Sequence, residues 1–194
     1  MIKTDNMLDA KGLACPMPIV KTKKVMNDLL PGQVLEVQAT DKGSTADLRT
    51  WSERVGHHYI GTVEEGDVLK HYLRKASDVE ETREETKHSV VTSNKELQQK
   101  LDSNEDIIII DVREEAEYSF NHIPGSKNIP IGVLEKNFGD LNKNGAVYVV
   151  CRTGYRSDLA AQKLTENGFT NVTNVVPGMS KWSGTTGSNV GSSL

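Results

Sequence analysis

The stretch Val147-Tyr-Val-Val-Cys151-Arg-Thr-Gly-Tyr-Arg-Ser157 decides the fold of the second half of this 194-residue chain. Residues 147–150 are all β-branched or aromatic and predict a buried strand, and residues 157–167 follow a helical pattern that ends in Asn167-Gly168. Only a short loop separates the two elements. Its thiol therefore lies at the carboxyl end of a strand, where ligand sites on open α/β sheets form.

The residues of this loop suit a bound anion. The loop amides and the amino terminus of the following helix converge on the Cys151 sulfur, where they stabilise a thiolate and any anion bound beside it. Arg152 and Arg156 add positive charge, and Gly154 lets the chain turn without a side chain obstructing the loop. The alternative is that Cys151 is an inert buried residue that behaves as a small hydrophobic side chain, the common fate of a lone cysteine.

Outward from the loop, residues 90–183 alternate short apolar stretches with helical ones. The expected strands are 90–91, 107–112, 127–129, 147–151 and 172–176, and the expected helices are 93–101, 114–120, 132–138 and 157–167. This alternation is typical of a parallel sheet flanked by helices on both faces. Residues 184–194 are rich in Gly, Ser and Thr and predict a disordered tail.

Three further blocks of sequence accompany the Cys151 loop. They are Asp111-Val-Arg-Glu-Glu-Ala-Glu-Tyr118, Asn121-His-Ile-Pro-Gly-Ser-Lys-Asn-Ile-Pro130, and Val175-Val-Pro-Gly178 before Trp182. Together with the loop they closely resemble the rhodanese family, over residues 88–183. Two positions depart from the family pattern: Asn121 and Met179 each stand where a Gly is usual. Asn tolerates a positive φ, so Met179 is the departure that affects the expected shape of its loop.

The resemblance implies a sulfurtransferase. Cys151 is then the nucleophile that takes a sulfane sulfur and holds it as a persulfide, with no other cofactor. The residues expected to bind the anionic donor are Arg152, Thr153, Gly154, Tyr155, Arg156 and Ser157. A phosphatase branch of the same fold also uses Cys and Arg, but its loop is one residue longer than the six residues from Cys151 to Arg156, so sulfur transfer is favoured.

Three titratable residues outside the loop are interpreted as structural. Asp111 and Arg113 lie at a strand end, and we expect Arg113 to pair with Glu117 or an adjacent backbone group rather than to take part in catalysis. His122 is expected to hold its own loop by hydrogen bonds rather than to act as a general base.

Residues 1–76 predict a separate α+β unit. The expected strands are 6–8, 34–39, 59–63 and 68–74, and the expected helices are 16–30 and a second one that runs to Val55 with Ser44 or Thr45 as its capping residue. Pro31-Gly32 closes the first helix, and Gly12 lets the chain turn sharply before it.

Cys15 lies at the start of the first helix. Proline is best tolerated in the first helical turn, so Cys15-Pro-Met-Pro18 places the thiol at or next to the amino-terminal cap. Free amides and the positive end of the helix dipole are then expected to lower the pKa of this thiol and raise its reactivity. The alternative is a capping cysteine without chemistry.

The sequence around Cys15 resembles the TusA-like sulfur carrier family over residues 5–75. The resemblance is carried by Leu8-Asp-Ala-Lys-Gly-Leu-Ala-Cys-Pro-Met-Pro18, by Ala39-Thr-Asp-Lys-Gly-Ser44, and by Asp47, Trp51 and Gly56-His57. It implies a two-layer α/β sandwich in which Cys15 carries a persulfide between protein partners. The cluster of Lys21, Lys23 and Lys24 is either a docking patch for acidic partners or a solvated helix face.

Charge supports a division of the chain into four parts. We expect a TusA-like domain at 1–76, an acidic linker at 77–89, a rhodanese domain at 90–183 and the tail at 184–194. The linker carries 2 basic and 5 acidic side chains and one aliphatic residue, too little apolar surface to order itself by forming a core. A solvated helical extension is the alternative for this segment.

Composition excludes several other classes of protein. A net charge of −4, from 23 basic and 27 acidic residues, disfavours general nucleic-acid binding. The longest aliphatic run, 107–110, is far shorter than the roughly 20 residues that cross a bilayer, and the first residues lack the features of a secretory signal, so we expect a cytoplasmic protein without membrane contact. His57, His58 and His71 have no nearby Cys or carboxylate cluster to complete a metal site, and we expect no metal.

Two cysteines in a reducing compartment indicate chemistry rather than a structural disulfide. The leading hypothesis is a sulfurtransferase in which Cys151 takes sulfur from thiosulfate or a small persulfide and Cys15 receives it for delivery to an acceptor protein. The second hypothesis is a carrier loaded at Cys15 by an external enzyme, with the rhodanese-like part only docking or discharging it. A redox switch with a Cys15–Cys151 disulfide is the third, and requires the two Cα atoms to come within about 7 Å.

Overall fold

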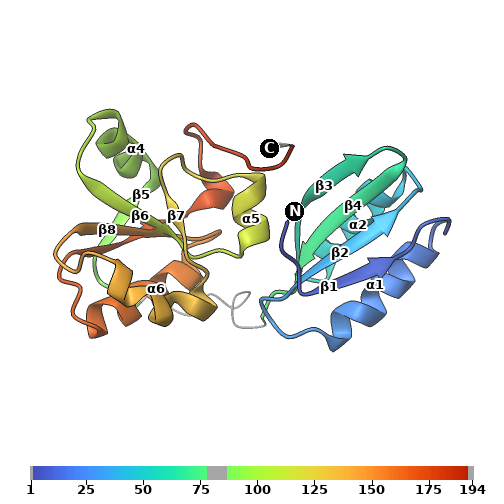
Figure 1. Cartoon of the computed structure of the whole chain (residues 1–194), viewed down its shortest axis with the longest axis horizontal. Coiled ribbons are helices and arrows are strands. Elements are labelled where there is room, and N and C mark those ends of the chain that lie inside the picture. Colours follow the sequence, from blue (N-terminus) through green and yellow to red (C-terminus); the bar gives the residue numbers. More distant parts are fainter. Residues whose placement is uncertain (1, 78–86, 192–194) are drawn as a thin grey trace. The chain divides into compact units, whose positions relative to one another are not determined.

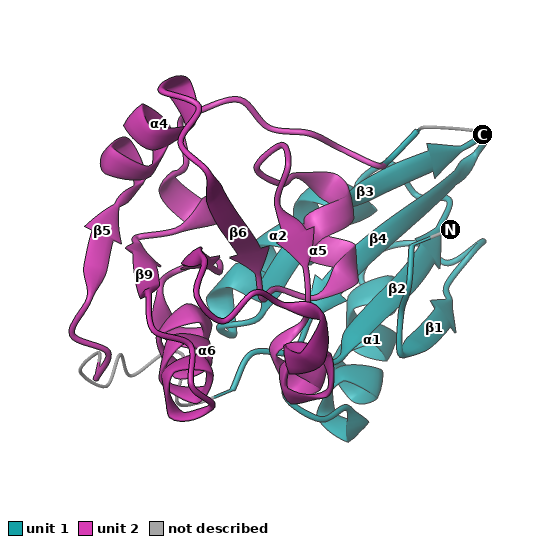
Figure 2. Cartoon of the chain, turned by 60° about the vertical axis from the view of Figure 1, so that its left-hand side comes forward, with its two compact units in different colours: residues 1–82, 190–194 teal, residues 83–189 magenta. Residues whose placement is uncertain are grey.

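The computed structural model describes residues 2–77 and 87–191. These residues form two compact units, one of residues 2–77 with 190 and 191, the other of residues 87–189 (Figure 2). The expected acidic linker falls mainly on residues 78–86, which lie outside the described residues. Each unit has its own sheet and its own buried core.

The amino-terminal unit is a four-stranded sheet with two helices (Figure 1). Its elements are β1 (Asn6–Asp9), α1 (Met17–Asp28), β2 (Val34–Ala39), α2 (Ser44–Arg54), β3 (His58–Glu65) and β4 (Val68–Arg74). The strand order is β1-β2-β4-β3, with β1 parallel to β2 and the other neighbours antiparallel. The six expected elements are all present, and each boundary lies within two residues of its expected position.

Both helices of this unit cover the same face of the sheet. Leu35 and Val37 alternate along β2, are fully buried, and share one cluster with Met26 of α1 and Leu48 of α2. Because alternate residues of a strand point to the same face, this single cluster places α1 and α2 in one layer above the sheet. The predicted two-layer α/β sandwich is confirmed.

A buried hydrogen-bond network holds the first turn of α2. Ser44 was expected to cap this helix as an acceptor, and that prediction is wrong, because its hydroxyl donates to the Asp41 carbonyl at 2.6 Å instead. The Ser44 oxygen can therefore accept from Nε2 of His71, 2.8 Å away, and Nδ1 of His71 accepts from the Tyr59 hydroxyl at 2.9 Å. Burial lowers the pKa of His71 to about 4, so the imidazole is neutral at pH 7.

The carboxy-terminal unit is a five-stranded parallel sheet flanked by helices (Figure 1). Its elements are β5 (Val91–Ser93), α4 (Asn94–Asp102), β6 (Ile107–Asp111), α5 (Glu115–Phe120), β7 (Lys127–Asn128), η1 (Ile131–Asp140), β8 (Ala146–Val150), α6 (Tyr155–Glu166), β9 (Val172–Val176) and η2 (Met179–Lys181). The order is β5-β9-β8-β6-β7, and every pair of neighbours is parallel. The expected helix at 132–138 is a 3₁₀ helix, and α6 begins two residues before its expected start.

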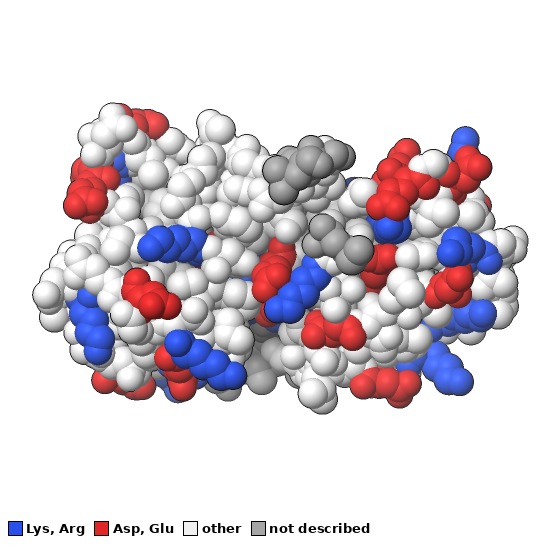
Figure 3. Space-filling view, in the orientation of Figure 1, with Lys and Arg blue, Asp and Glu red and all other residues white. Residues whose placement is uncertain are grey.

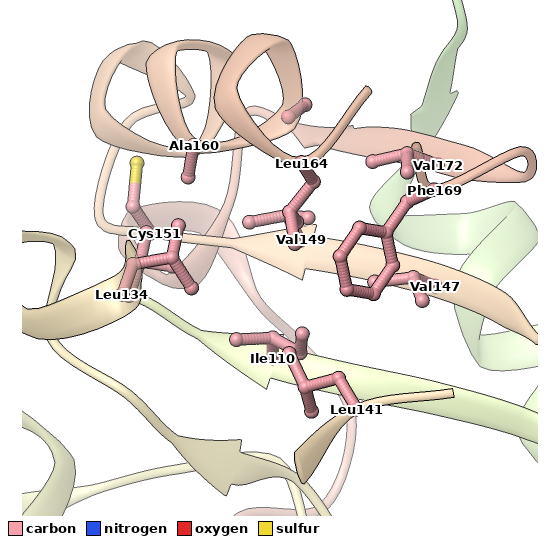
Figure 4. Close-up of a cluster of buried hydrophobic side chains, with 12 residues drawn as sticks. Ile110, Leu134, Leu141, Val147, Val149, Cys151, Ala160, Leu164, Phe169 and Val172 are labelled. Atoms are coloured by element: carbon pink, nitrogen blue, oxygen red, sulfur yellow. The ribbon is translucent and has the colours of Figure 1, made fainter. Parts of the chain in front are cut away.

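Strand β8 lies at the centre of this sheet and has a buried face on each side. Val147 and Val149 point into a cluster that includes Leu164 of α6 (Figure 4). Tyr148 and Val150 point the other way, into a cluster with Leu97 of α4. An apolar run that is buried on both faces requires helices on both faces, which confirms the predicted fold class.

The expectation of a disordered tail is corrected for residues 184–189. Gly187 exchanges backbone hydrogen bonds with His122, at 3.0 and 2.8 Å, and the Asn189 amide donates to the Ser119 carbonyl at 2.8 Å. The Gly, Ser and Thr content of this segment predicts that few of its side chains are buried. Its order comes instead from main-chain hydrogen bonds, which amino-acid composition does not reveal. A Cβ on Gly187 would lie 2.7 Å from Nε2 of His122, so a larger residue there requires the His122 ring to move.

Two surface observations bear on function. Lysine and arginine side chains are interspersed with aspartate and glutamate on the face that Figure 3 shows, rather than gathered in one basic area. Along residues 2–77 and 87–191, no helix combines the length and the apolarity that a membrane span requires.

Candidate functional site

Cys151 is the first residue after β8 and is 1 % exposed. The alternation of Val147 and Val149 continues to residue 151, so its side chain faces the same side of the sheet as α6. Figure 4 shows the Cys151 sulfur at the end of this apolar cluster, directed toward the helix that carries Ala160 and Leu164. The strand thus delivers the thiol to the start of α6.

Two hydrogen-bond donors reach the Cys151 sulfur. The Gly154 amide donates to Sγ at 3.1 Å, and the Ser157 hydroxyl lies 3.3 Å from Sγ and 3.1 Å from the Gly154 carbonyl. Gly154 has a φ of 99°, and a Cβ there would lie 2.8 Å from Val176 Cγ1. Because only glycine fits this left-handed turn, Gly154 is what aims a main-chain amide at the sulfur. Such donors stabilise negative charge on sulfur.

A second segment of the chain, residues 178–180, contacts the main-chain carbonyl groups at the start of the loop. The Met179 amide donates to the Cys151 carbonyl at 2.8 Å, and the Ser180 amide donates to the Arg152 carbonyl at 2.9 Å. Gly178 has a φ of 80°, and a Cβ there would lie 2.4 Å from the Cys151 carbonyl oxygen. The position of Cys151 therefore depends on a backbone approach that a side chain at residue 178 would block.

Asn94 holds the segment at Gly178 in place, and this role was not predicted from the sequence. Its side-chain amide donates to the Gly178 carbonyl at 2.9 Å and accepts from the Gly178 amide at 3.2 Å. Met179, where the family pattern has a Gly, places its side chain in the buried cluster with Leu97 and Val175. The core thus accommodates the Met179 side chain, and the backbone hydrogen bonds to the loop are present.

The two loop arginines have different surroundings. The Arg156 guanidinium is buried and makes a bidentate ion pair with Glu117 of α5, with Nη1 and Nη2 at 2.7 and 2.9 Å from the carboxylate oxygens. A carboxylate of the same unit therefore occupies two of the guanidinium N–H groups, and donor binding by Arg156 stays a prediction. Arg152 and Thr153 are exposed beside Cys151, and Tyr155 is half-buried. Arg152 is therefore the loop cation that solvent can reach.

The residues interpreted as structural have structural contacts. Arg113 pairs with Asp111, with Nη2 to Oδ2 at 2.6 Å, and donates to the Asn121 carbonyl at 2.7 Å, so of the two expected kinds of partner it has the backbone group and not Glu117. His122 places Nδ1 2.8 Å from the Tyr118 carbonyl and stacks on the Tyr118 ring with centroids 4.0 Å apart. Both side chains hold the segment that follows β6.

Cys15 is exposed and precedes α1, as the sequence predicted. The expected supply of free amides is smaller than predicted. Pro16 and Pro18 have no N–H group, and the Met17 amide donates to the Ala14 carbonyl at 3.0 Å. The same prolines that mark this helix start in the sequence therefore remove two of the amides that could stabilise a thiolate.

Two carboxylates act on the pKa of Cys15 instead, Asp47 in the first turn of α2 and Asp41 before that helix. The hydrogen bond to Asp47, followed by desolvation and by the charges of Asp47 and Asp41, raises the pKa of Cys15 above that of a free thiol. The predicted lowering of this pKa is wrong, because the carboxylates that raise it come from α2 and the loop before it, outside the helix that Cys15 precedes.

Comparison with known proteins connects both halves of the chain to sulfur chemistry. Residues 6–75 match the family described as Sulfurtransferase TusA, and residues 93–185 match the family described as Rhodanese-like domain. A protein of Bacillus subtilis, "Putative sulfur carrier protein YrkF", is 51% identical over 186 residues, which cover 96% of this chain and 100% of that protein. The sulfur carrier protein TusA of Allochromatium vinosum is 43% identical over 77 residues, 40% of this chain and 100% of its own length.

Solved structures support the fold of the second half. The solution structure of the rhodanese-like domain of the Alr3790 protein from an Anabaena species superposes with a TM-score of 0.50. The two share 24% sequence identity, and the match covers 55% of this chain and 85% of that domain. At this level of identity the likeness concerns the fold, a parallel sheet with flanking helices.

Proposed function

Because the chain belongs to the family in which a TusA unit precedes a rhodanese-like unit, we propose that it is a sulfurtransferase that loads sulfur on Cys151 and passes it to Cys15. The observation that carries the proposal is the pair of donors on the Cys151 sulfur, the Gly154 amide at 3.1 Å and the Ser157 hydroxyl at 3.3 Å. These donors stabilise negative charge on sulfur in the attacking thiolate and in the persulfide that replaces it.

The first step takes sulfane sulfur from thiosulfate or a small persulfide. With thiosulfate, the Cys151 thiolate attacks the outer sulfur, the sulfur–sulfur bond of the donor breaks, and sulfite leaves with the bonding electron pair. The product is a Cys151 persulfide anion, and no other cofactor takes part. The exposed Arg152 is the group that attracts the dianionic donor, while the buried Arg156–Glu117 pair holds the loop.

The second step moves the sulfur to the carrier thiol. The Cys15 thiolate attacks the terminal sulfur of the Cys151 persulfide, that sulfur–sulfur bond breaks, and the Cys151 thiolate leaves ready for another cycle. Cys15 is exposed, so an acceptor protein can then reach its persulfide. Both steps need reduced thiols, which a reducing compartment such as the cytoplasm maintains.

The test is thiosulfate-dependent sulfur transfer in the whole chain and in two variants. Replacing Cys151 by Ser should abolish sulfite release and the formation of cyanide-labile sulfur, while replacing Cys15 by Ser should leave loading of Cys151 intact. Passage within one chain predicts a rate of arrival at Cys15 that does not depend on protein concentration. Full activity of Cys151→Ser together with loss of activity in Cys15→Ser would contradict the proposal.

A second candidate function is a carrier that an external enzyme loads at Cys15. It is favoured by the exposure of Cys15 and by the names of the two relatives described above, both of which contain the words sulfur carrier protein. One experiment separates the two candidates. A sulfurtransferase with intact Cys151 forms cyanide-labile persulfide from thiosulfate alone, whereas a carrier of this kind forms it only when a loading enzyme is added.

A further inference from the structure

The buried side chain of Asn174 has no role in the transfer steps described above. Asn174 is the central residue of β9 and is fully buried. Its side chain faces α6, because Val172, two residues earlier in the strand, packs in one cluster with Leu164 of that helix (Figure 4). The residue beside it in β8 is Val149. A polar amide therefore stands in a part of the core where apolar side chains are the rule.

The Asn174 amide contacts the loop that carries Cys151. Its Nδ2 donates to the Gly154 carbonyl at 3.3 Å. The reverse orientation of the amide would set its oxygen against the carbonyl oxygen, so nitrogen is the atom that faces the loop. The Asn174 oxygen Oδ1 is buried and has no hydrogen-bond partner among the residues that the structure describes. An unpaired buried oxygen costs stability, so this contact with the loop is made at a cost to the core.

Three donors converge on the Gly154 carbonyl. Besides Asn174 Nδ2, the main-chain amide of Asp158 donates to it at 3.1 Å, and the Ser157 hydroxyl lies 3.1 Å from it. A carbonyl oxygen has two lone pairs, so two donors satisfy it. The amides of Asp158 and Asn174 fill these two places. The Ser157 hydroxyl is then the donor in excess.

The Ser157 hydroxyl has one proton and two acceptors within reach. They are the Gly154 carbonyl at 3.1 Å and the Cys151 sulfur at 3.3 Å. A thiol sulfur is a weak acceptor beside a carbonyl oxygen, so an unoccupied carbonyl would take the proton. With the carbonyl occupied by Asn174, the proton is available to the sulfur.

We propose that Asn174 is a positioning residue for sulfur transfer, which occupies the Gly154 carbonyl and thereby directs the Ser157 hydroxyl proton to the Cys151 sulfur. Donation from the hydroxyl stabilises the thiolate that attacks the donor, and again the thiolate that leaves when the sulfur is passed on. The inference rests on the proposed function, in which Cys151 is the attacking group, and adds a residue that acts on the sulfur through Ser157.

The competing explanation is that Asn174 only ties the loop to the sheet. In that case its removal affects Cys151 whether or not residue 157 carries a hydroxyl. A double-mutant cycle separates the two explanations, because a residue that acts through Ser157 has no effect once Ser157 is replaced by Ala. The criterion is this dependence on Ser157, which a change in stability does not produce.

The test variant is Asn174→Leu, which keeps a branched side chain and removes both polar atoms. It is made in the parent and in Ser157→Ala, with Asn174→Ala as a second variant should the larger leucine not fold. The matched control is Thr173→Val, a polar-to-apolar change at a buried position of the same strand. Because successive residues of a strand point to opposite faces, Thr173 faces away from α6. Urea unfolding verifies that each variant is folded.

The protein is the full chain with Cys15→Ser, in which Cys151 is the one remaining cysteine of the two in the sequence. The first probe is methyl methanethiosulfonate, a small neutral reagent. The Cys151 thiolate attacks its methylthio sulfur, the sulfur–sulfur bond of the reagent breaks, and methanesulfinate leaves with the electron pair. The second probe is thiosulfate, with sulfite release as the signal. The neutral reagent decides the inference, and sulfite release decides the proposed function.

The expected result is that Asn174→Leu lowers the rate constant for methyl methanethiosulfonate about fivefold, the effect of losing one hydrogen bond to the thiolate. In Ser157→Ala, the same change at residue 174 should leave the rate constant within about twofold. Thr173→Val should leave the rate constant unchanged in both backgrounds.

Four outcomes would overturn the inference. They are an unchanged rate constant in Asn174→Leu, an equal loss with and without the Ser157 hydroxyl, an equal loss in Thr173→Val, and failure of both Asn174 variants to fold. If Cys151 of the parent did not react with methyl methanethiosulfonate, the inference and the proposed function would both be contradicted. Coupling between Asn174 and Ser157 without sulfite release from thiosulfate would contradict the proposed function alone.

Discussion

The two cysteines occupy similar places in their units and have opposite surroundings. Each precedes a helix, Cys151 before α6 and Cys15 before α1. At Cys151 a glycine in a left-handed conformation turns a main-chain amide onto the sulfur, whereas at Cys15 two prolines remove amides and Asp47 raises the pKa of the thiol. The start of a helix therefore does not determine the electrostatics of a thiol; the residues that supply or remove donors there do.

The backbone constraints around the two thiols differ as well. Gly178 lies against the loop that carries Cys151, and a Cβ there would lie 2.4 Å from the Cys151 carbonyl oxygen and 3.2 Å from that of Arg152. Gly12, in the segment before Cys15, also has a positive φ, of 73°, but a Cβ there meets nothing within 4 Å. We therefore expect the loop around Cys151 to be sensitive to a side chain at residue 178, and the segment before Cys15 to tolerate a side chain at residue 12.

The largest expected effect comes from replacing these two glycines by alanine. Gly178→Ala combines backbone strain with a collision against main-chain atoms, so it should destabilise the carboxy-terminal unit by on the order of 5 kcal/mol and abolish loading of Cys151. Gly12→Ala introduces strain alone and should cost about 1 kcal/mol. The effect of Gly178→Ala is measured by urea unfolding followed through Trp182 fluorescence in a Trp51→Phe background. The effect of Gly12→Ala is measured in the same way through Trp51 in a Trp182→Phe background. If the two changes lowered the unfolding free energy of their units equally, the backbone constraints around the two cysteines would not differ as described.

The next effect concerns the buried ion pair beneath the Cys151 loop. Glu117→Ala takes the carboxylate away from a guanidinium that is 5% exposed, and we expect a loss of about 3 to 5 kcal/mol in the unfolding free energy of this unit. The control is the exposed pair Lys70–Glu65 of the other unit, where Glu65→Ala should cost less than about 1 kcal/mol. A small loss in Glu117→Ala would show that Arg156 does not hold the loop in the way described.

The third effect is a loss of stability in acid that we expect for the amino-terminal unit, which contains His71. The pKa of His71 is lowered to about 4 by burial, from 6.5. The unfolded chain therefore binds a proton at His71 as the pH falls below 6.5, and the folded unit does not do so until about pH 4. The amino-terminal unit should lose about 3 kcal/mol of stability between pH 6.5 and pH 4 from this residue.

The measurement is the urea midpoint of the amino-terminal unit, followed through Trp51 in a Trp182→Phe background at a series of pH values. His71→Asn should flatten the profile in this range while lowering stability at neutral pH, because the hydrogen bonds to Ser44 and Tyr59 change. A profile with the same slope in the parent and in His71→Asn would assign the acid sensitivity to other groups.

The smallest effect concerns donor binding by the loop cations. Arg152→Ala should raise the KM for thiosulfate about tenfold, the value of one charge-assisted contact of about 1.5 kcal/mol, and leave the stability of the unit nearly unchanged. Lys163→Ala, which removes an exposed cation on α6, is the control and should leave KM unchanged. Kinetics of Arg152→Ala equal to those of the parent would show that the loop amides alone suffice.

Much of the fold could be predicted from the sequence, because it depends on local patterns. Alternation in β2, the apolar run in β8 and the prolines and glycines at element ends each report on their own neighbourhood. The segment around Gly187 escaped prediction because its order comes from main-chain pairing with His122, a residue far away in the sequence. Composition says nothing about such pairing.

The chemistry of the site was predictable only in part, for a similar reason. Both cysteines could be found from motifs, but the partners of Arg156 and Cys15 are Glu117 and Asp47, each on a different element and about 30 to 40 residues distant. Spacing along one helix start suggested a donor-binding Arg156 and a Cys15 of lowered pKa. The three-dimensional structure gives Arg156 a carboxylate partner that the sequence did not predict, and it reverses the expected direction of the Cys15 pKa.

The most direct test of this account is to identify which thiol is loaded first. The intact chain is mixed with a limiting amount of thiosulfate, quenched with a neutral alkylating reagent at successive times, and digested, and the persulfide on the Cys15 and Cys151 peptides is measured by mass spectrometry. The account predicts that sulfur appears on Cys151 first and on Cys15 later, and never on Cys15 in the Cys151→Ser variant. Persulfide that forms first on Cys15, or that forms there without Cys151, would contradict it.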